Sequence, residues 1–169
     1  MNKTAFLLLF TGSILTLSMR SSAQGKTGCV SMSEVIDAMP ETKKADSTLA
    51  RYKAELERQF EAFQAEYTEQ ARFLSSSDTA KYTLAQLNLK RQSLAQLLGK
   101  LQGYDQEAGA LFNQKRTALL QPIQKKAEDA IQQVSKENGF AFVFEKETLH
   151  VYPPSADILP LVKKKLGLL

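Results

Sequence analysis

The chain has 169 residues and a mass of 18.8 kDa, enough for one domain or one domain with an appendage. Its composition, 43% hydrophobic and 24% charged, is normal for a globular protein and argues against wholesale disorder. One Cys and one His exclude a disulfide framework and a zinc site built from several such residues of one chain, and the few Gly and Pro argue against propeller, collagen and Gly-rich phosphate-binding folds.

Residues 1–23 have the pattern of a secretory signal peptide. Lys3 precedes an interrupted apolar stretch over 5–17, and a small-residue cleavage pattern ends at Ala23. The stretch is too short and too diluted to favour the alternative of an uncleaved anchor. A lipid anchor on Cys29 is a second alternative, but a charge lies where the lipidation signal needs an apolar residue. We expect export, cleavage after Ala23 and a soluble mature protein.

Removal of the signal peptide lowers the net charge. Without Lys3 and Arg20 the 22 basic residues become 20, against 18 acidic ones, which leaves +2. A secreted protein of this charge is a poor candidate for nucleic-acid binding, so no nucleic-acid partner is expected.

The first elements of the mature chain are short. Residues 27–31 favour a strand, and Ser31 with Glu34 has the spacing of a capping box that opens a short helix over 34–38. Pro40 then suits the first position of a new helix.

Residues 41–138 consist mainly of strong helix formers and predict two long helices. The cluster Ser75–Thr79 predicts the turn between them, because short polar side chains compete with helical backbone hydrogen bonds. Apolar residues spaced three and four apart then predict an antiparallel coiled-coil hairpin, an arm over 41–121. The stripe of the first helix is Leu49, Tyr52, Leu56, Phe60, Phe63, Tyr67 and Leu74, and that of the second is Leu84, Leu87, Leu94, Leu98, Leu101, Ala108, Phe112 and Leu119.

Pro122 is expected to divide the second helix, because a mid-helix proline removes a hydrogen bond. Residues 79–121 then return along the first helix, and 122–138 form a separate helix on a small body made of 24–40 and 122–169. At about 1.5 Å per residue, the arm would project roughly 50–60 Å.

The C-terminal segment predicts a hairpin and a last helix. Asn138-Gly139 favours a left-handed helix cap, and 140–144 favours a strand with both faces buried. A second strand is expected over 149–152, and Asp157 is expected to cap a helix that runs through Lys165.

A body of roughly 60 residues is marginal alone, and its short strands leave open edges. We therefore expect a homo-oligomer with a shared sheet or barrel. The fold class is mainly α with a small β body, and the residues expected at the oligomer contact are Val30, Phe140, Phe142, Phe144, Leu149 and Val151.

This order of elements resembles the Skp/OmpH family of periplasmic chaperones. The resemblance covers 24–169 and is carried by the stretches 34–41 (EVIDAMPE), 120–123 (LQPI), 137–140 (ENGF) and 157–167 (DILPLVKKKLG). It implies a jellyfish-shaped, prefoldin-like trimer, whose three arms surround a cavity for unfolded outer-membrane proteins.

The sequence contains neither of two common catalytic motifs. The chain lacks a P-loop and a G-x-S-x-G motif, and His150 has no Ser or Cys partner. Cys29 is expected to be a small buried side chain, with an intersubunit disulfide as the alternative. We expect no enzyme activity and no catalytic, cofactor or metal site.

Charge is uneven along the arm. Residues 41–71 carry −2, residues 72–100 carry +4 and residues 101–138 carry zero. This pattern is either a chance property of a solvated face or a basic arm end that attracts acidic clients or an anionic membrane surface. The residues expected to bind clients are Phe60, Phe63, Tyr67, Arg72, Phe73, Lys81, Lys90, Arg91 and Lys100.

Two functions compete. The first is an ATP-independent holdase that encloses unfolded outer-membrane proteins, and the second is a structural coiled-coil envelope protein or adaptor with a folded partner. Phe60 and Phe63 favour the first, because they are bulky for a tight two-stranded seam and leave apolar surface for a client.

Overall fold

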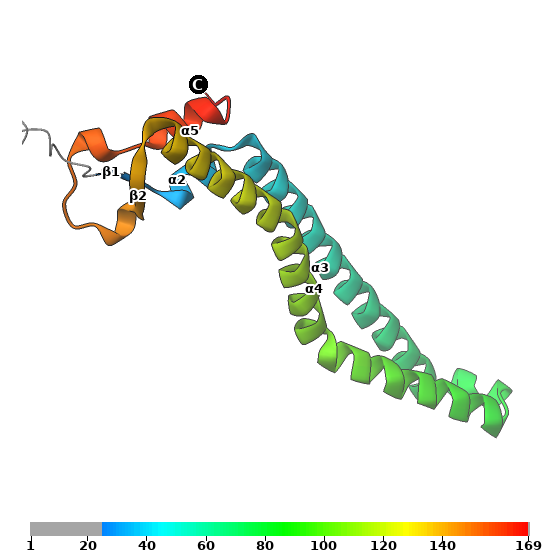
Figure 1. Ribbon diagram of the computed structural model, residues 1–169. Helices are drawn as coiled ribbons and strands as arrows, with labels where there is room; N and C mark the ends of the chain where they lie inside the picture. The colour runs from blue at the N-terminus through cyan, green and yellow to red at the C-terminus, as the bar shows by residue number, and fades with distance from the viewer. Residues whose placement is uncertain (1–24, 169) are drawn as a thin grey trace, which may run out of the picture.

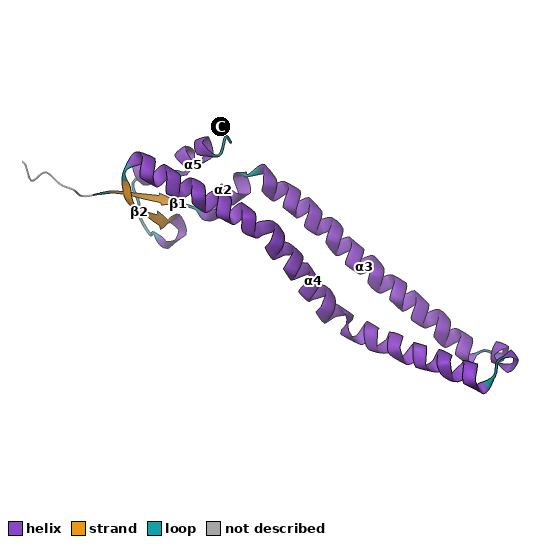
Figure 2. Ribbon diagram, turned by 45° about the vertical axis from the view of Figure 1, so that its right-hand side comes forward, coloured by secondary structure: helices purple, strands orange, loops and turns teal. Residues whose placement is uncertain are grey.

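The computed structural model describes residues 25–168, so the predicted signal peptide and its cleavage site lie outside the described residues. The strands and the short helices gather at one end, and two long helices run out from this body together (Figure 1). Figure 2 shows the same division from a second side. The predicted fold class, mainly α with a small β body and a long helical hairpin, is confirmed.

The strands form a parallel pair. Strand β1 (Lys26–Val30) pairs with β2 (Phe140–Glu145), with Cys29 opposite Phe144. On its other side β1 makes a single bridge from Cys29 to Asp157, and the Cys29 carbonyl accepts a 3.0 Å hydrogen bond from the Ile158 amide. Strand β1 is therefore central, and the outer edge of β2 has no partner strand among residues 25–168.

The N-terminal helices start as predicted, with one difference. The Ser31 side chain caps α2 (Met32–Ala38) by accepting from the Glu34 amide at 3.2 Å, and Pro40 opens α3 (Pro40–Ser75). The other half of the predicted capping box is wrong, because the Glu34 carboxylate pairs with Lys146 instead.

The arm is the antiparallel pair of α3 and α4 (Leu84–Asn138). The turn between them includes the 3-10 helix η2 (Ser77–Lys81), so α4 starts five residues later than Thr79, the predicted start. Its start is a capping box that the sequence contains but the prediction missed. Gln86 N donates to the Thr83 hydroxyl at 3.3 Å, and Gln86 Oε1 accepts from Thr83 N at 2.9 Å.

The prediction that Pro122 divides the second helix is wrong, because α4 continues through it to Asn138. The proline ring is exposed, and the missing N–H leaves a single gap in the ladder of hydrogen bonds. Packing on both sides of the gap outweighs that cost. The helix ends at Gly139, whose φ of 71° is the predicted left-handed cap.

The core lies where α4 crosses the body. One face of α4 contributes Ile123, Ala127, Ala130 and Val134, and the body adds a ring of buried side chains around it. The added side chains are Val30, Val35, Met39, Ala45, Ile158 and Val162.

The C-terminal segment differs from the prediction. After β2 the chain forms the 3-10 helices η3 (Lys146–Thr148) and η4 (Pro154–Ala156), and then α5 (Leu159–Lys165). Residues 149–152 form no strand, so the predicted hairpin is wrong for the single chain. Asp157 holds the start of α5 as expected, since its Oδ1 accepts from the Leu159 amide at 2.9 Å.

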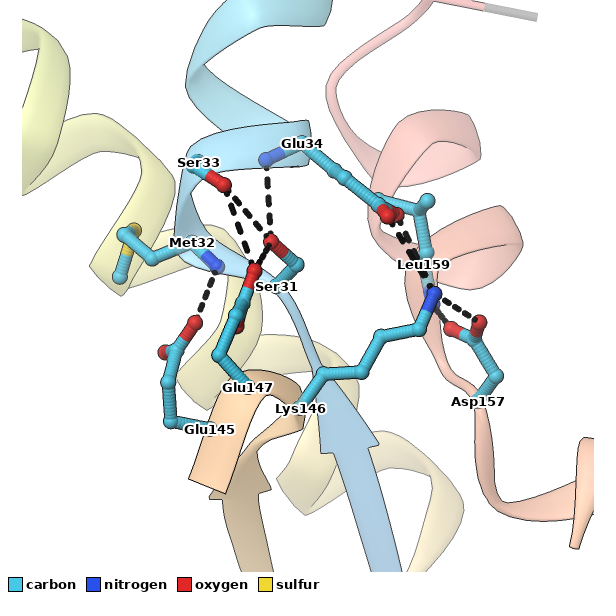
Figure 3. Close-up of polar contacts among 9 residues, drawn as sticks. All are labelled: Ser31, Met32, Ser33, Glu34, Glu145, Lys146, Glu147, Asp157 and Leu159. Carbon is cyan, nitrogen blue, oxygen red and sulfur yellow. Dashed lines mark hydrogen bonds and ion pairs between the residues drawn. The ribbon is translucent and has the colours of Figure 1, made fainter. Parts of the chain in front are cut away.

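A cluster of polar side chains ties β1 and α2 to the end of β2 (Figure 3). The Ser31 hydroxyl donates to Glu147 Oε1, and the Ser33 hydroxyl lies 3.4 Å from the same oxygen. The Met32 amide donates to Glu145 Oε1 at 2.9 Å. Two carboxylates, one from the last residue of β2 and one from the segment after it, thus satisfy groups at the first turn of α2.

Lys146, which lies between Glu145 and Glu147 in the sequence, completes the cluster. Its ammonium group lies 3.3 Å from Glu34 and 3.1 Å from Asp157, so it joins α2 to the segment before α5 (Figure 3). These partners raise the pKa of Lys146, Asp157 most of all, and the group stays charged. We call these residues, with Ser31, Ser33, Glu145 and Glu147, the polar clamp.

Glu145 and Glu147, two of the carboxylates of the polar clamp, have opposite pKa shifts. The hydrogen bond from Ser31, helped by Glu145, lowers the pKa of Glu147 to about 2. Burial, and then the neighbouring Glu147, raise the pKa of Glu145. A group whose pKa is lowered on folding stabilises the fold above its ordinary pKa of 4.5, and this contribution is lost as the pH falls towards about 2.

We therefore expect Glu147→Gln to lower the free energy of unfolding at pH 7. The deficit should shrink as the pH falls below 4.5, because the wild-type carboxylate then becomes protonated as well. Urea denaturation at a series of pH values measures both effects. The matched control is Glu145→Gln, which keeps an acceptor for the Met32 amide and offers an N–H donor to Glu147, so it should not lower stability at pH 7. Equal pH profiles for Glu147→Gln and wild type would contradict the role of Glu147.

Glycines inside α4 give a second prediction. A Cβ atom added at Gly99 or Gly103 would meet no atom within 4 Å. Because glycine costs about 0.5–1 kcal/mol relative to alanine in a helix interior, Gly99→Ala and Gly103→Ala should each raise the free energy of unfolding by about that amount. Gly139→Ala is the control and should lower it, because φ there is 71°. Chemical denaturation measures the three values, and a loss of stability at Gly99 or Gly103 would contradict this account.

Candidate functional site

The apolar stripe predicted for α3 faces α4. Leu49 and Leu56 are buried, and the rest of the stripe is half-buried. The seam therefore runs along the whole arm, and the prediction for this helix is confirmed. The half-buried members are Tyr52, Phe60, Phe63, Tyr67 and Leu74.

The stripe predicted for α4 is partly wrong. Its most buried arm residues are Leu97 and Tyr104, which the prediction left out. Two of its predicted members are exposed, Leu84 at 77% and Leu98 at 39%. The helix is turned relative to the prediction, so its seam follows Leu97, Leu101, Tyr104 and Ala108.

Tyr104 is the central contact of the arm. Its hydroxyl donates a 2.7 Å hydrogen bond to the Leu56 carbonyl, and its ring centre lies 5.5 Å from that of Phe60 and 5.7 Å from that of Phe63. Burial raises the pKa of the Tyr104 hydroxyl, which therefore remains a donor. Two of the predicted client-binding aromatic residues thus pack within the hairpin and are only half exposed.

The structure also brings predicted bases onto predicted aromatic rings. Lys100 Nζ lies 3.7 Å from the Phe63 ring centre, and Lys90 Nζ lies 4.7 Å from that of Phe73. The Phe73 ring in turn packs edge-on against Tyr82 at 5.2 Å. These cation–π pairs cover the aromatic seam with charge. The other predicted bases, Arg72, Lys81 and Arg91, are exposed, and Tyr67 is half-buried.

Large apolar side chains that the prediction missed are exposed along the arm. Leu89 is 67% exposed, close to the 77% of Leu84, and neither packs into the seam. Further along α4, Leu98 and Leu111 are also exposed. The sequence could have indicated the exposure of two of them, because Leu89 and Leu111 lie outside the stripe predicted for α4.

A second apolar surface lies on the body. Phe142 and Phe144 are 65% and 47% exposed, with stacked rings 6.3 Å apart, and Val151 is 89% exposed. The expectation that both faces of β2 are buried is wrong for the single chain. Phe140 and Leu149 are half-buried. Val30 is only 3% exposed and packs in the core of its own chain, so it presents no surface to a partner.

The residues with reactive side chains lie apart. Cys29 is 1% exposed, as predicted, and burial raises the pKa of its thiol. His150 is exposed, and the Ser31 hydroxyl makes its hydrogen bonds in the polar clamp with the Ser33 hydroxyl, the Glu34 amide and the Glu147 carboxylate. Within residues 25–168, no three His, Cys, Asp or Glu side chains are placed to hold a metal ion. No helix in this part of the chain is long and apolar enough to cross a membrane.

Comparison with solved structures finds a protein of the same fold. A crystal structure from Caulobacter crescentus, described as a candidate outer-membrane chaperone (OmpH-like), superposes with a TM-score of 0.69. The alignment covers 88% of this chain and 86% of that one, at 15% sequence identity, which establishes a shared fold. A search of curated proteins found no match.

Comparison with protein families agrees. The family described as outer membrane protein (OmpH-like) matches residues 26–166, a span that includes both strands, the arm and α5. The chain therefore belongs to the OmpH-like family.

Proposed function

We propose that the protein is an ATP-independent holdase chaperone that binds unfolded outer-membrane proteins in the periplasm and prevents their aggregation. The main support is the row of exposed large apolar side chains on the arm, headed by Leu84 and Leu89 at 77% and 67% exposure. Apolar contact is non-directional, so it suits partners that share hydrophobicity but no fixed sequence. A structural adaptor would instead need a surface matched to one folded partner.

The basic charge of the arm end supports a second part of the proposal, the initial encounter with a client. Residues 72–100 carry +4, and Arg72, Lys81 and Arg91 are exposed near the arm end. Exposed charges act over about 8 Å at physiological salt, so they mainly speed the encounter with an acidic unfolded chain. The same charges would also favour contact with an anionic membrane surface.

Assembly is the third part of the proposal. Phe142 and Phe144 form an exposed apolar pair on β2, whose outer edge is unpaired within residues 25–168, and Val151 is exposed in the segment that follows. A homo-oligomer, a trimer by the family resemblance, would cover this surface and place several arms around one cavity.

The holding activity is tested by Leu84→Gln with Leu89→Gln. Both residues are exposed, so the double change should alter stability by less than about 0.5 kcal/mol per site. Suppression of aggregation of a diluted, urea-unfolded outer-membrane β-barrel should nevertheless fall, because less apolar surface remains. Light scattering against several unrelated barrels measures it, with Gln92→Asn and Gln96→Asn on the same helix as the control. Undiminished suppression by the leucine variant, or no suppression by the wild type, would contradict the proposal.

Assembly is tested by Phe142→Asp. Since this ring is 65% exposed in one chain, a charge there should leave the fold of the chain intact and disrupt a contact between chains. The native mass should fall from that of an oligomer to that of a monomer, with the arm still helical by circular dichroism. Val151→Asp, in the exposed segment after β2, is the companion variant. A native mass unchanged in both variants would exclude this surface from assembly.

A further inference from the structure

The arm contains a groove at mid-length that the cation–π pairs do not cover. It lies on one side of the seam, has a volume of about 540 Å³, and is largely apolar. We call it the mid-arm groove. Its apolar lining consists of Leu56, Phe60, Tyr104, Ala108 and Phe112.

Small residues of α4 create the hollow. Gly109 lies in its lining, and a Cβ atom added there would meet no atom within 4 Å. The adjacent Ala108 adds only a methyl group. Tyr104, held by its hydrogen bond to the Leu56 carbonyl, cannot swing out to fill the space without losing that bond. The groove is therefore a fixed feature of the packed arm.

The rim of the mid-arm groove is acidic, in contrast to the arm end. It carries Glu57, Glu61 and Asp105 against one base, Lys53. Lys53 lies 3.9 Å from Glu57, whereas Glu61 and Asp105 have no ion-pair partner among residues 25–168. Two unpaired carboxylates therefore flank an apolar floor.

We propose that the mid-arm groove binds an apolar side chain, aromatic above all, of an extended peptide segment that carries Lys or Arg beside it. The floor removes the apolar side chain from water, and the two free carboxylates pair with the flanking base. This inference rests on the proposed holdase function and adds a selectivity to it. The basic arm end favours acidic segments, and the groove favours basic aromatic ones, so one arm contacts both.

Because the chain has no Trp residue, the emission of a Trp-containing peptide comes from the peptide alone and gives a direct test. A short peptide with Trp between two Lys residues is titrated with the full mature protein at low salt, and the shift of Trp emission reports burial. The matched peptide has Glu in place of Lys. The Lys peptide should bind about tenfold tighter, a preference opposite to that of a basic arm end. Equal binding, tighter binding of the Glu peptide or no binding of either overturns the proposal.

Two variants locate the binding. Gly109→Leu should fill the groove and weaken binding of the Lys peptide by about tenfold or more, while helicity and stability are kept, because the site is an open helix position. Gly103→Leu makes the same change at a glycine that does not line the groove, and it should bind like wild type. Equal binding by the two variants excludes the groove. A change of native mass in Gly109→Leu alone assigns the groove to a second copy of the chain and overturns the proposal.

The charges are tested by Glu61→Gln with Asp105→Asn. Exposed ion pairs are individually weak, so binding of the Lys peptide should fall about two- to tenfold, and the preference over the Glu peptide should shrink with it. An unchanged preference contradicts a role for the two carboxylates. The peptide measurement is independent of aggregation assays. Specific peptide binding without suppression of aggregation would refute the holdase function and leave the groove, whereas suppression without peptide binding would refute the groove alone.

Discussion

The continuity of α4 through Pro122 couples the two parts of the molecule. Beyond the proline, Ile123, Ala127 and Val134 lie in the core of the body. Before it, Leu97 and Tyr104 lie in the seam of the arm. A break at Pro122 would leave the arm attached to the body through α3 alone, at its junction with α2. The lost backbone hydrogen bond is a small cost beside the packing that the unbroken helix makes on both sides.

The seam of the arm explains which part of the fold could be predicted from the sequence. For α3 a single apolar stripe exists, and the residues on it are those that face α4. For α4 the sequence allows two alternative apolar stripes. Both contain Leu87, Leu94, Leu101 and Ala108, and they differ in the residues between these four. One has Arg91 and Asp105 as interruptions, and the other has Lys90, Leu97 and Tyr104. The second is the real seam, and its Lys90 lies over an aromatic ring of α3, which no count of apolar residues on one helix can reveal.

The body was harder to predict for a different reason. Local patterns located both strands, the caps at Ser31 and Gly139, and the start of α5. They could not show that β1 lies between β2 and Asp157, because that arrangement depends on contacts between distant segments. The expected strand over 149–152 is absent from the described chain, although the outer edge of β2 is unpaired there. Similarly, the mid-arm groove follows from the alignment of small residues on α4 with Phe60 on α3, and neither helix indicates it alone.

The parallel pairing of β1 with β2 has a consequence for how the chain reaches this structure. Lys26 and Phe140 are partners, yet the whole arm lies between them in the sequence. Closing so long a loop is entropically costly and slow when the loop is unfolded. Helices form within microseconds, and a folded hairpin brings Glu41 back beside Lys126, so the loop that remains to be closed is short. Formation of the arm before the body therefore lowers the entropic cost of pairing β1 with β2. During synthesis β1 is made first and stays unpaired until β2 has been made.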